Sequence, residues 1–235
     1  MAAEPRVLVV QHQADCPPAL LGLWLDAEGC PPDVRHPYAG EALPADLHGH
    51  AGLVVLGGSM GAGDDADHPW LAATRALVRT AAATGVPTLG LCLGHQLAAV
   101  ALGGVVAVNP RGRQFGVLPV GWTPEAADDP LFASRPTPVI HWNNDVVTAL
   151  PPGGVTLAVA PDGTVQAARF AQSVWGVQAH PEVDEAIVAR WAADEREEIG
   201  PEVVDTALAG MRAAAPRLAR AWRPVVTAFA GRVRA

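Results

Sequence analysis

Short apolar runs rich in Val and Leu alternate with longer stretches of helical periodicity along the first part of the chain. An uninterrupted apolar run is typical of a strand buried on both faces, whereas apolar residues spaced three and four apart are typical of a helix buried on one face. Strands are predicted at 6–11, 51–56 and 86–91, and helices at 18–29, 69–83 and 95–102. Since helices that join buried strands produce parallel pairing, this pattern predicts an α/β fold with a doubly wound, mostly parallel sheet.

The strand-like segments that follow are shorter, and turn residues separate them. Segments of this kind are predicted at 105–109, 115–122, 139–142, 155–159, 165–170 and 174–178. Short strands joined by turns are typical of antiparallel pairing, so we expect an antiparallel or mixed extension of the same sheet.

The residues from 184 to 234 have a helical pattern, with interruptions expected at Gly200-Pro201, Pro216 and Pro224 because proline cannot donate the helical hydrogen bond. Apolar side chains at three- and four-residue steps give this tail one face that can cover the rest of the molecule. They are Leu208, Met211, Ala215, Leu218 and Trp222. We predict one domain at 1–190 and a C-terminal helical extension at 191–235 that packs on the same domain.

Composition narrows the class of protein. Half of the 235 residues are apolar and 17% are charged, which allows a sizeable core. The longest nearly apolar run, 97–108, is much shorter than the ~20 residues of a membrane-spanning helix, and no signal-peptide pattern precedes the first strand. Cys16, Cys30 and Cys92 are too widely spaced for a zinc site or a disulfide framework. We therefore expect a cytoplasmic protein.

The basic residues exclude two kinds of chemistry. All 16 are Arg, and without Lys the chain can form neither a lysine Schiff base nor a phosphate-binding loop that ends in Gly-Lys-Ser/Thr. The 24 acidic residues give a net charge of −8, which disfavours a nucleic-acid partner. Residues 212–235 are the exception, with six Arg and no acid. A solvated helix face is the preferred interpretation, and docking of an acidic partner is the alternative.

The segment Gly90-Leu91-Cys92-Leu93-Gly94 lies between a predicted buried strand and a predicted helix. It has the form of a nucleophile elbow, G-x-nucleophile-x-G, with Cys in the position of Ser. The glycines permit a tight turn, and the N-terminus of the following helix favours the thiolate over the thiol. The pattern alone is weak, and a buried inert cysteine is the alternative.

A thiol nucleophile needs a base and a group that orients the base. His180 closes a strand-like run and Glu182 follows two residues later, so both side chains point to the same side of an extended chain. The carboxylate can then hold the imidazole in place and stabilise its charged form. The alternative is a surface histidine beside a helix-capping glutamate.

A third motif, Gly57-Gly58-Ser59-Met60-Gly61, directly follows another predicted buried strand. A backbone free of side chains can present an N–H group to a developing oxyanion, and the N–H of Leu93 is the natural second donor. An ordinary glycine turn is the alternative interpretation of this motif.

Together the three motifs resemble the class I glutamine amidotransferases, whose members use a Cys-His-Glu triad. The segment from Gly90 to Gln96 is similar to the nucleophile motif of that family, and His180-Pro181-Glu182 is similar to its closing motif. The resemblance spans about residues 6–190, and it implies a flavodoxin-like fold.

Finer features resemble a stand-alone subgroup related to the glutaminase domain of GMP synthase. They include Val10-Gln11-His12, the glycine motif at 57–61 and His68-Pro69-Trp70-Leu71. That subgroup has a Trp-His-Gly-Asp segment near the substrate, where this chain has Trp142-Asn143-Asn144-Asp145. Ala179 replaces the usual Phe before the catalytic His. Both departures fall at the substrate pocket.

The resemblance implies a reaction and a role for each residue. Cys92 attacks the side-chain carboxamide of glutamine, His180 transfers protons, and Glu182 orients His180. Ammonia leaves, and water then hydrolyses the γ-glutamyl thioester to glutamate. The backbone amides of Gly58 and Leu93 form the oxyanion hole, and the side chains implied in substrate binding are Gln96, Asn143 and Asp145. A thiolate, a base and two donors suffice for acyl transfer, so no metal and no organic cofactor is expected.

The destination of the ammonia is open at this stage. Amidotransferases usually deliver it to a synthase, and the residues beyond the triad are too few to form one. We expect either a separate ammonia-accepting synthase chain or a protein that acts alone on glutamine. Two alternatives remain, a γ-glutamyl peptidase acting on γ-glutamyl compounds by the same acyl chemistry, and a non-catalytic amidotransferase-like binding subunit. Neither a nucleic acid nor a membrane is expected as a partner.

Overall fold

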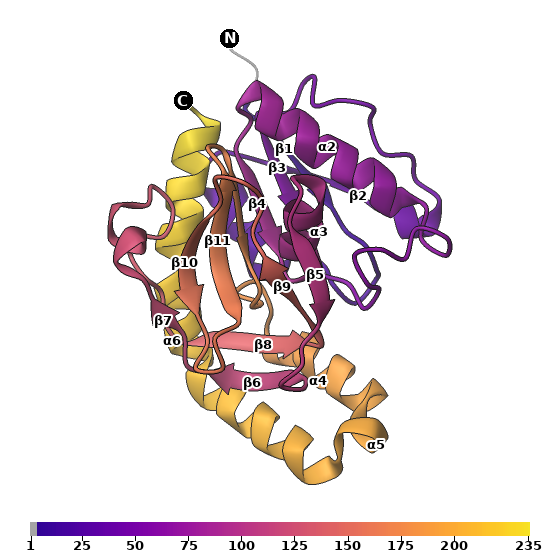
Figure 1. Ribbon diagram of the computed structural model, residues 1–235, viewed down its shortest axis with the longest axis vertical. Coiled ribbons are helices and arrows are strands. Elements are labelled where there is room, and N and C mark those ends of the chain that lie inside the picture. Colours follow the sequence, from indigo (N-terminus) through magenta and orange to yellow (C-terminus); the bar gives the residue numbers. More distant parts are fainter. Residues whose placement is uncertain (1–3) are drawn as a thin grey trace.

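The computed structural model describes residues 4–235, and residues 1–3, at the start of the predicted domain 1–190, lie outside the described residues. Over residues 4–235 a central sheet of eight strands runs through the molecule (Figure 1). From one edge to the other the strands are β2 (Pro32–Arg35), β1 (Val7–Val10), β3 (Gly52–Val55), β4 (Thr88–Leu91), β12 (Val174–Val177), β11 (Val165–Ala171), β10 (Val155–Val159) and β7 (Gly121–Trp122).

Strands β2, β1, β3, β4 and β12 pair in parallel, and β11, β10 and β7 continue the sheet in antiparallel pairing. In chain order the parallel strands have the 2-1-3-4-5 arrangement of flavodoxin-like folds. The predicted fold class, an α/β doubly wound and mostly parallel sheet with an antiparallel extension, is therefore confirmed.

Helices cover both faces of the parallel strands, because successive side chains of a buried strand point to opposite faces. Along β1, Val7 and Val9 belong to one apolar cluster, and Leu8 and Val10 belong to the other. The first cluster includes residues of α1 (Ala19–Ala27) and α6 (Pro201–Val233), and the second includes residues of α2 (Trp70–Thr84) and α3 (Leu93–Ala101). β1 is thus apolar along its whole length, as the sequence pattern indicates.

The expected extension of the sheet is only partly right. β5 (Val105–Val108) pairs with β9 (Asp145–Ala149), and β6 (Gln114–Leu118) pairs with β8 (Val139–Asn143), in two-stranded ladders separate from the central sheet. The segment predicted at 115–122 is therefore two strands, β6 and β7. Pro119 lies between them and cannot donate to a ladder, so the first strand ends before it.

The C-terminal part consists of α4 (Glu185–Asp194), α5 (Arg196–Ile199) and α6, and two short 3-10 turns lie earlier at Pro37–Ala39 and Pro124–Asp128. The break at Gly200 is as predicted, but the breaks predicted at Pro216 and Pro224 are wrong, because α6 continues through both. Both prolines lie on the solvent-facing side, where water can satisfy the carbonyls that lose a donor. The helix changes direction along its length (Figure 1).

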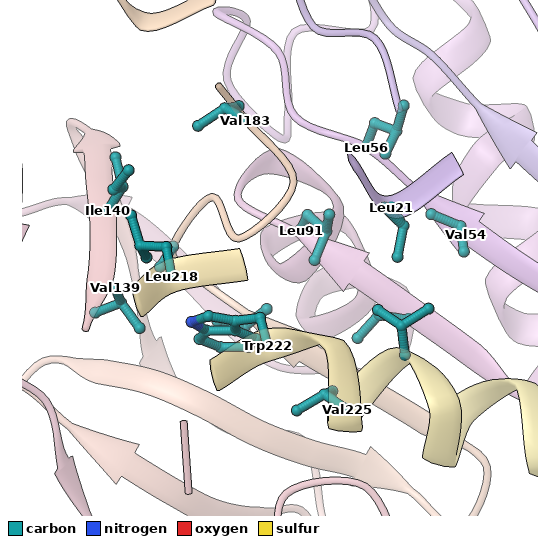
Figure 2. Packing of buried hydrophobic residues seen from close by; sticks show 14 of the residues in the cluster. Leu21, Val54, Leu56, Leu91, Val139, Ile140, Val183, Leu218, Trp222 and Val225 are labelled. Carbon is teal, nitrogen blue, oxygen red and sulfur yellow. The ribbon is translucent and has the colours of Figure 1, made fainter. Parts of the chain in front are cut away.

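Helix α6 packs against α1, α4 and β6 through one apolar face. Its residues Leu218, Trp222 and Val225 lie in the same cluster as Ile140 of β8 (Figure 2). The indole N–H of Trp222 donates to the Pro138 carbonyl at 2.9 Å. Within residues 4–235, no helix combines the length and the apolar character needed to cross a membrane.

Candidate active site

Cys92 occupies the turn between β4 and α3 and has φ 49° and ψ −107°, in a region that side-chain-bearing residues rarely adopt. The two flanking glycines make this turn possible. A Cβ atom at Gly90 would overlap the carbonyl group of Gly94, and one at Gly94 would overlap the carbonyl group of Val55. Helix α3 starts at Leu93, earlier than the predicted start at His95, so its N-terminus lies directly beside the thiol.

The Cys92 thiol lies at a cavity of about 510 Å³ that is lined by residues from β1, β3, β8 and α4 or the loops after them. The cavity is in the range of pockets that enclose whole small molecules. Because it opens at the carboxyl ends of β1, β3 and β4, it has the position expected for a ligand site in an open parallel sheet.

His180 and Glu182 follow the end of β12, and both side chains are buried. Nδ1 of His180 lies 2.8 Å from Oε1 of Glu182, and the backbone N–H of His180 donates to the Ile140 carbonyl at 2.8 Å. Burial lowers the pKa of His180, but the Cys92 sulfur and the Glu182 carboxylate outweigh burial and raise the pKa above its ordinary value. The surroundings therefore favour the imidazolium form when the thiolate is present.

Gly57 and Gly58 bring the chain after β3 close to these side chains. A Cβ atom at Gly57 would lie 2.8 Å from Cε1 of His180 and 3.6 Å from Cβ of Cys92. Within residues 4–235, the backbone N–H groups of Gly58 and Leu93 donate to no backbone carbonyl. The two donors expected from the sequence are thus not used by the backbone, and Gly58 lines the cavity.

The three side chains expected to contact substrate all line the cavity. Nε2 of Gln96 donates to the Asp145 carbonyl at 2.9 Å and to Oε1 of Gln178 at 3.3 Å, so much of its hydrogen bonding is internal. Nδ2 of Asn143 donates to Oε1 of Gln114 at 3.2 Å. Its buried Oδ1 has no hydrogen-bond partner within the described part of the chain.

The sequence analysis did not predict two side chains that lie next to Cys92 and His180. Nε2 of Gln178 lies 3.6 Å from Sγ of Cys92, and the Trp191 indole packs on the His180 ring with centroids 4.8 Å apart. Gln178 closes the strand predicted at 174–178 and stands two residues before His180, and this spacing is a signal that could have found it. Trp191 comes from α4, and no local pattern connects it to the site.

The other two cysteines differ from Cys92 in their surroundings. Burial and then the Asp15 charge raise the pKa of Cys16 far above its ordinary value. Burial also raises the pKa of Cys30, which packs against α6 and accepts a contact from Arg234 at 3.8 Å. Neither lies at a strand-to-helix elbow. Within residues 4–235, no group of His, Cys, Asp and Glu is arranged to hold a metal ion.

Comparison with known proteins agrees with this geometry. The family model described as glutamine amidotransferase class-I matches residues 31–187. The chain belongs to the class-I glutamine amidotransferase family. The chain is 30% identical over 182 residues to the glutamine amidotransferase-like protein YfeJ of Salmonella typhimurium, with 75% of each chain covered. The resemblance that the sequence motifs indicate is confirmed.

The chain is also 42% identical over 106 residues to the glutamine-hydrolyzing GMP synthase of a Parafrankia species. That match covers 43% of this chain and 19% of the synthase, so it spans about a fifth of the relative's length. The structure of a glutamine amidotransferase from Methylobacillus flagellatus superposes with a TM-score of 0.85 at 28% identity, covering 99% of this chain and 95% of that one. The similarity to that structure includes α6.

Proposed function

We propose that this amidotransferase hydrolyses the side-chain amide of glutamine through a γ-glutamyl thioester on Cys92. The observation that carries the proposal is the His180–Glu182 pair, 2.8 Å apart and buried beside a cysteine in a strained elbow. A base held by a carboxylate next to an activated thiol is the arrangement that acyl transfer requires.

The proposed reaction has two halves. Sγ of Cys92 forms a bond to the amide carbon, the C–N bond breaks, and His180 gives the leaving nitrogen a proton, so ammonia is released. Water then attacks the thioester with His180 as base, and glutamate leaves as the thiol is restored. In both halves the negative charge on the carbonyl oxygen is stabilised by the N–H groups of Gly58 and Leu93.

We further propose that the ammonia passes to a synthase on a separate chain. The aligned region makes up 19% of the Parafrankia GMP synthase, so most of that relative has no counterpart in the match. An enzyme that acts alone would instead release ammonia into solution at its full rate without any partner.

Release of ammonia from glutamine by the purified protein tests the proposal. The parent protein should turn over, Cys92→Ala should not, and Cys30→Ala should behave as the parent because Cys30 lies away from the cavity. Turnover that persists in Cys92→Ala would refute the role of the thiol. A parent protein that binds glutamine but releases no ammonia, alone or with a synthase, would favour the non-catalytic binding subunit.

A second candidate, a hydrolase of larger γ-glutamyl compounds, is favoured by the volume of the cavity. At about 510 Å³ it is larger than one free amino acid requires. The acyl chemistry is unchanged, since only the group on the amide nitrogen differs.

A further inference from the structure

Several side-chain carboxylates line the cavity. They are Asp15, Asp64, Asp145, Asp194 and Glu195. Among the described residues Arg113 is the one arginine that lines it, and its Nη2 and Nη1 atoms lie 2.8 Å from carboxylate oxygens of Glu195 and Glu198. Glu195 is therefore neutralised within the protein. The other four carboxylates form no ion pair with an arginine in residues 4–235.

These carboxylates act on one another. Asp145 is half-buried, and burial followed by the charge of Asp64 raises the pKa of its carboxyl group. The smaller contribution, from Asp64, shows that two negative charges lie near each other at the cavity, and a positive ligand charge would relieve their repulsion.

Two indole rings complete one end of the cavity. Trp142 and Trp191 both line it, with ring centroids 6.4 Å apart, and Nε1 of Trp142 donates to Oε2 of Glu195 at 3.0 Å. Aromatic faces attract ammonium groups through the ring quadrupole. Carboxylates together with indoles are a lining suited to an organic cation.

We propose that the preferred substrates are γ-glutamyl amides whose amine part carries a second, protonated amine, such as the γ-glutamyl amides of diamines. This inference rests on the second candidate function, the hydrolysis of larger γ-glutamyl compounds through the same thioester on Cys92. The glutamyl part brings one ammonium and one carboxylate and so no net charge, which leaves the four unpaired carboxylates without a matching cation. The distal ammonium group supplies that cation.

The chemistry balances without any further reactant. Sγ of Cys92 takes the glutamyl carbon, the C–N bond breaks, and the diamine leaves with a proton from His180. Water then hydrolyses the thioester, so the products are glutamate and the free diamine.

The substrate class is tested with amides that differ only at the far end of the amine. We would measure kcat/KM for glutamate release from the γ-glutamyl amides of 1,4-diaminobutane and of pentylamine, which has a methyl group in place of the ammonium, and from glutamine. The cationic amide should be preferred to the neutral one by about tenfold or more, as a few exposed charge pairs provide. The preference should shrink in about 0.5 M salt.

Two double variants test which carboxylates cause the preference for the cationic amide. Asp64→Asn with Asp194→Asn should bring the two amides within about threefold of each other, with the neutral amide little affected. The matched control is Asp67→Asn with Glu197→Gln, which removes the same charge from exposed positions near the same loops but outside the cavity lining. The control should keep the parent's preference.

The outcomes separate the inference from the proposed function. Equal rates for the cationic and neutral amides would overturn the inference and leave the proposed function standing. If no amide is hydrolysed, glutamine included, the proposed function fails. Binding of the two amides to Cys92→Ala by calorimetry then tests the inference alone, because tighter binding of the cationic amide supports it and equal or undetectable binding refutes it.

Discussion

Nδ1 of His180 and Oε1 of Glu182 lie 2.8 Å apart at the end of β12, with both side chains buried. Only Pro181 separates them in the sequence, so the contact is local to this short segment. The pair fixes which ring nitrogen remains free to face Cys92, and it holds the imidazole in one orientation.

His180 and Glu182 should contribute unequally to the rate of catalysis. His180→Ala removes the proton carrier and should lower kcat/KM by about 10⁶-fold, close to the effect of Cys92→Ala, while Glu182→Gln keeps a misaligned base and should lower it by about 10⁴-fold. The measurement is steady-state ammonia release, with circular dichroism to show that each variant is folded. A folded Glu182→Gln as inactive as Cys92→Ala would contradict this ranking.

Gly57 should be required for the position of His180 and not for folding. A Cβ atom at Gly57 would lie 2.8 Å from Cε1 of His180, so Gly57→Ala should displace the ring and lower kcat by about 10²-fold. Gly63→Ala is the matched control, since a Cβ atom there meets nothing within 4 Å. Equal activity of the two variants would mean that the ring tolerates the displacement.

Buried neutral histidines should make the protein sensitive to acid. Burial lowers the pKa of His95 to about 3, and burial followed by the His180 charge lowers the pKa of His141 to about 4. The ordinary value is 6.5, so between pH 6.5 and these values the unfolded chain binds more protons than the folded chain. Stability should therefore be present above pH 6.5 and decline as the pH falls through this window.

A histidine variant isolates this effect. His95→Leu removes one of these groups, so its free energy of unfolding should fall less steeply with decreasing pH, by up to about 1.4 kcal/mol per pH unit. Urea denaturation at several pH values measures the slope. His48→Gln, with a fully solvated side chain, is the control and should keep the parent's slope. A parental slope in His95→Leu would show that this histidine is not held neutral.

The C-terminal extension predicted at 191–235 should contribute strongly to stability. Trp222 is 1% exposed and its N–H group donates to the Pro138 carbonyl, so Trp222→Ala should lower the free energy of unfolding by about 3–5 kcal/mol. Leu23→Ala, at an exposed position, should change it by less than about 0.5 kcal/mol. A loss below about 1 kcal/mol for Trp222→Ala would indicate a tail that is only loosely attached.

The sequence predicts a structural element best where a single local pattern of residues determines that element. Long apolar runs predicted β1, β3 and β4, and the glycines around Cys92 predicted the elbow. β2 was missed because its residues, Pro32–Arg35, are half-buried at the sheet edge and show no apolar run. Of the apolar stripe predicted on α6, Met211, Leu218 and Trp222 are buried, but Leu208 and Ala215 are only partly buried. Their neighbours Ala207 and Ala214 are buried instead.

The rest of the site depends on contacts between distant segments. Trp191 of α4 packs on the His180 ring, and Asp15 and Asp194 line the same cavity although they lie far apart in the sequence. No single sequence motif predicts the shape of this cavity. The pairing of β6 with β8 likewise depends on tertiary contacts that periodicity does not report. The cytoplasmic location stays a prediction.

Covalent labelling tests the central claim, that Cys92 is the nucleophile for a γ-glutamyl group. The protein is treated with an electrophilic glutamine analogue, with and without excess glutamine, and the modified peptides are identified by mass spectrometry. We predict that Cys92 alone is modified, that glutamine protects it, and that Cys16 and Cys30, whose pKa values burial raises, stay unmodified. Equal modification of the three cysteines, or no protection by glutamine, would contradict the account.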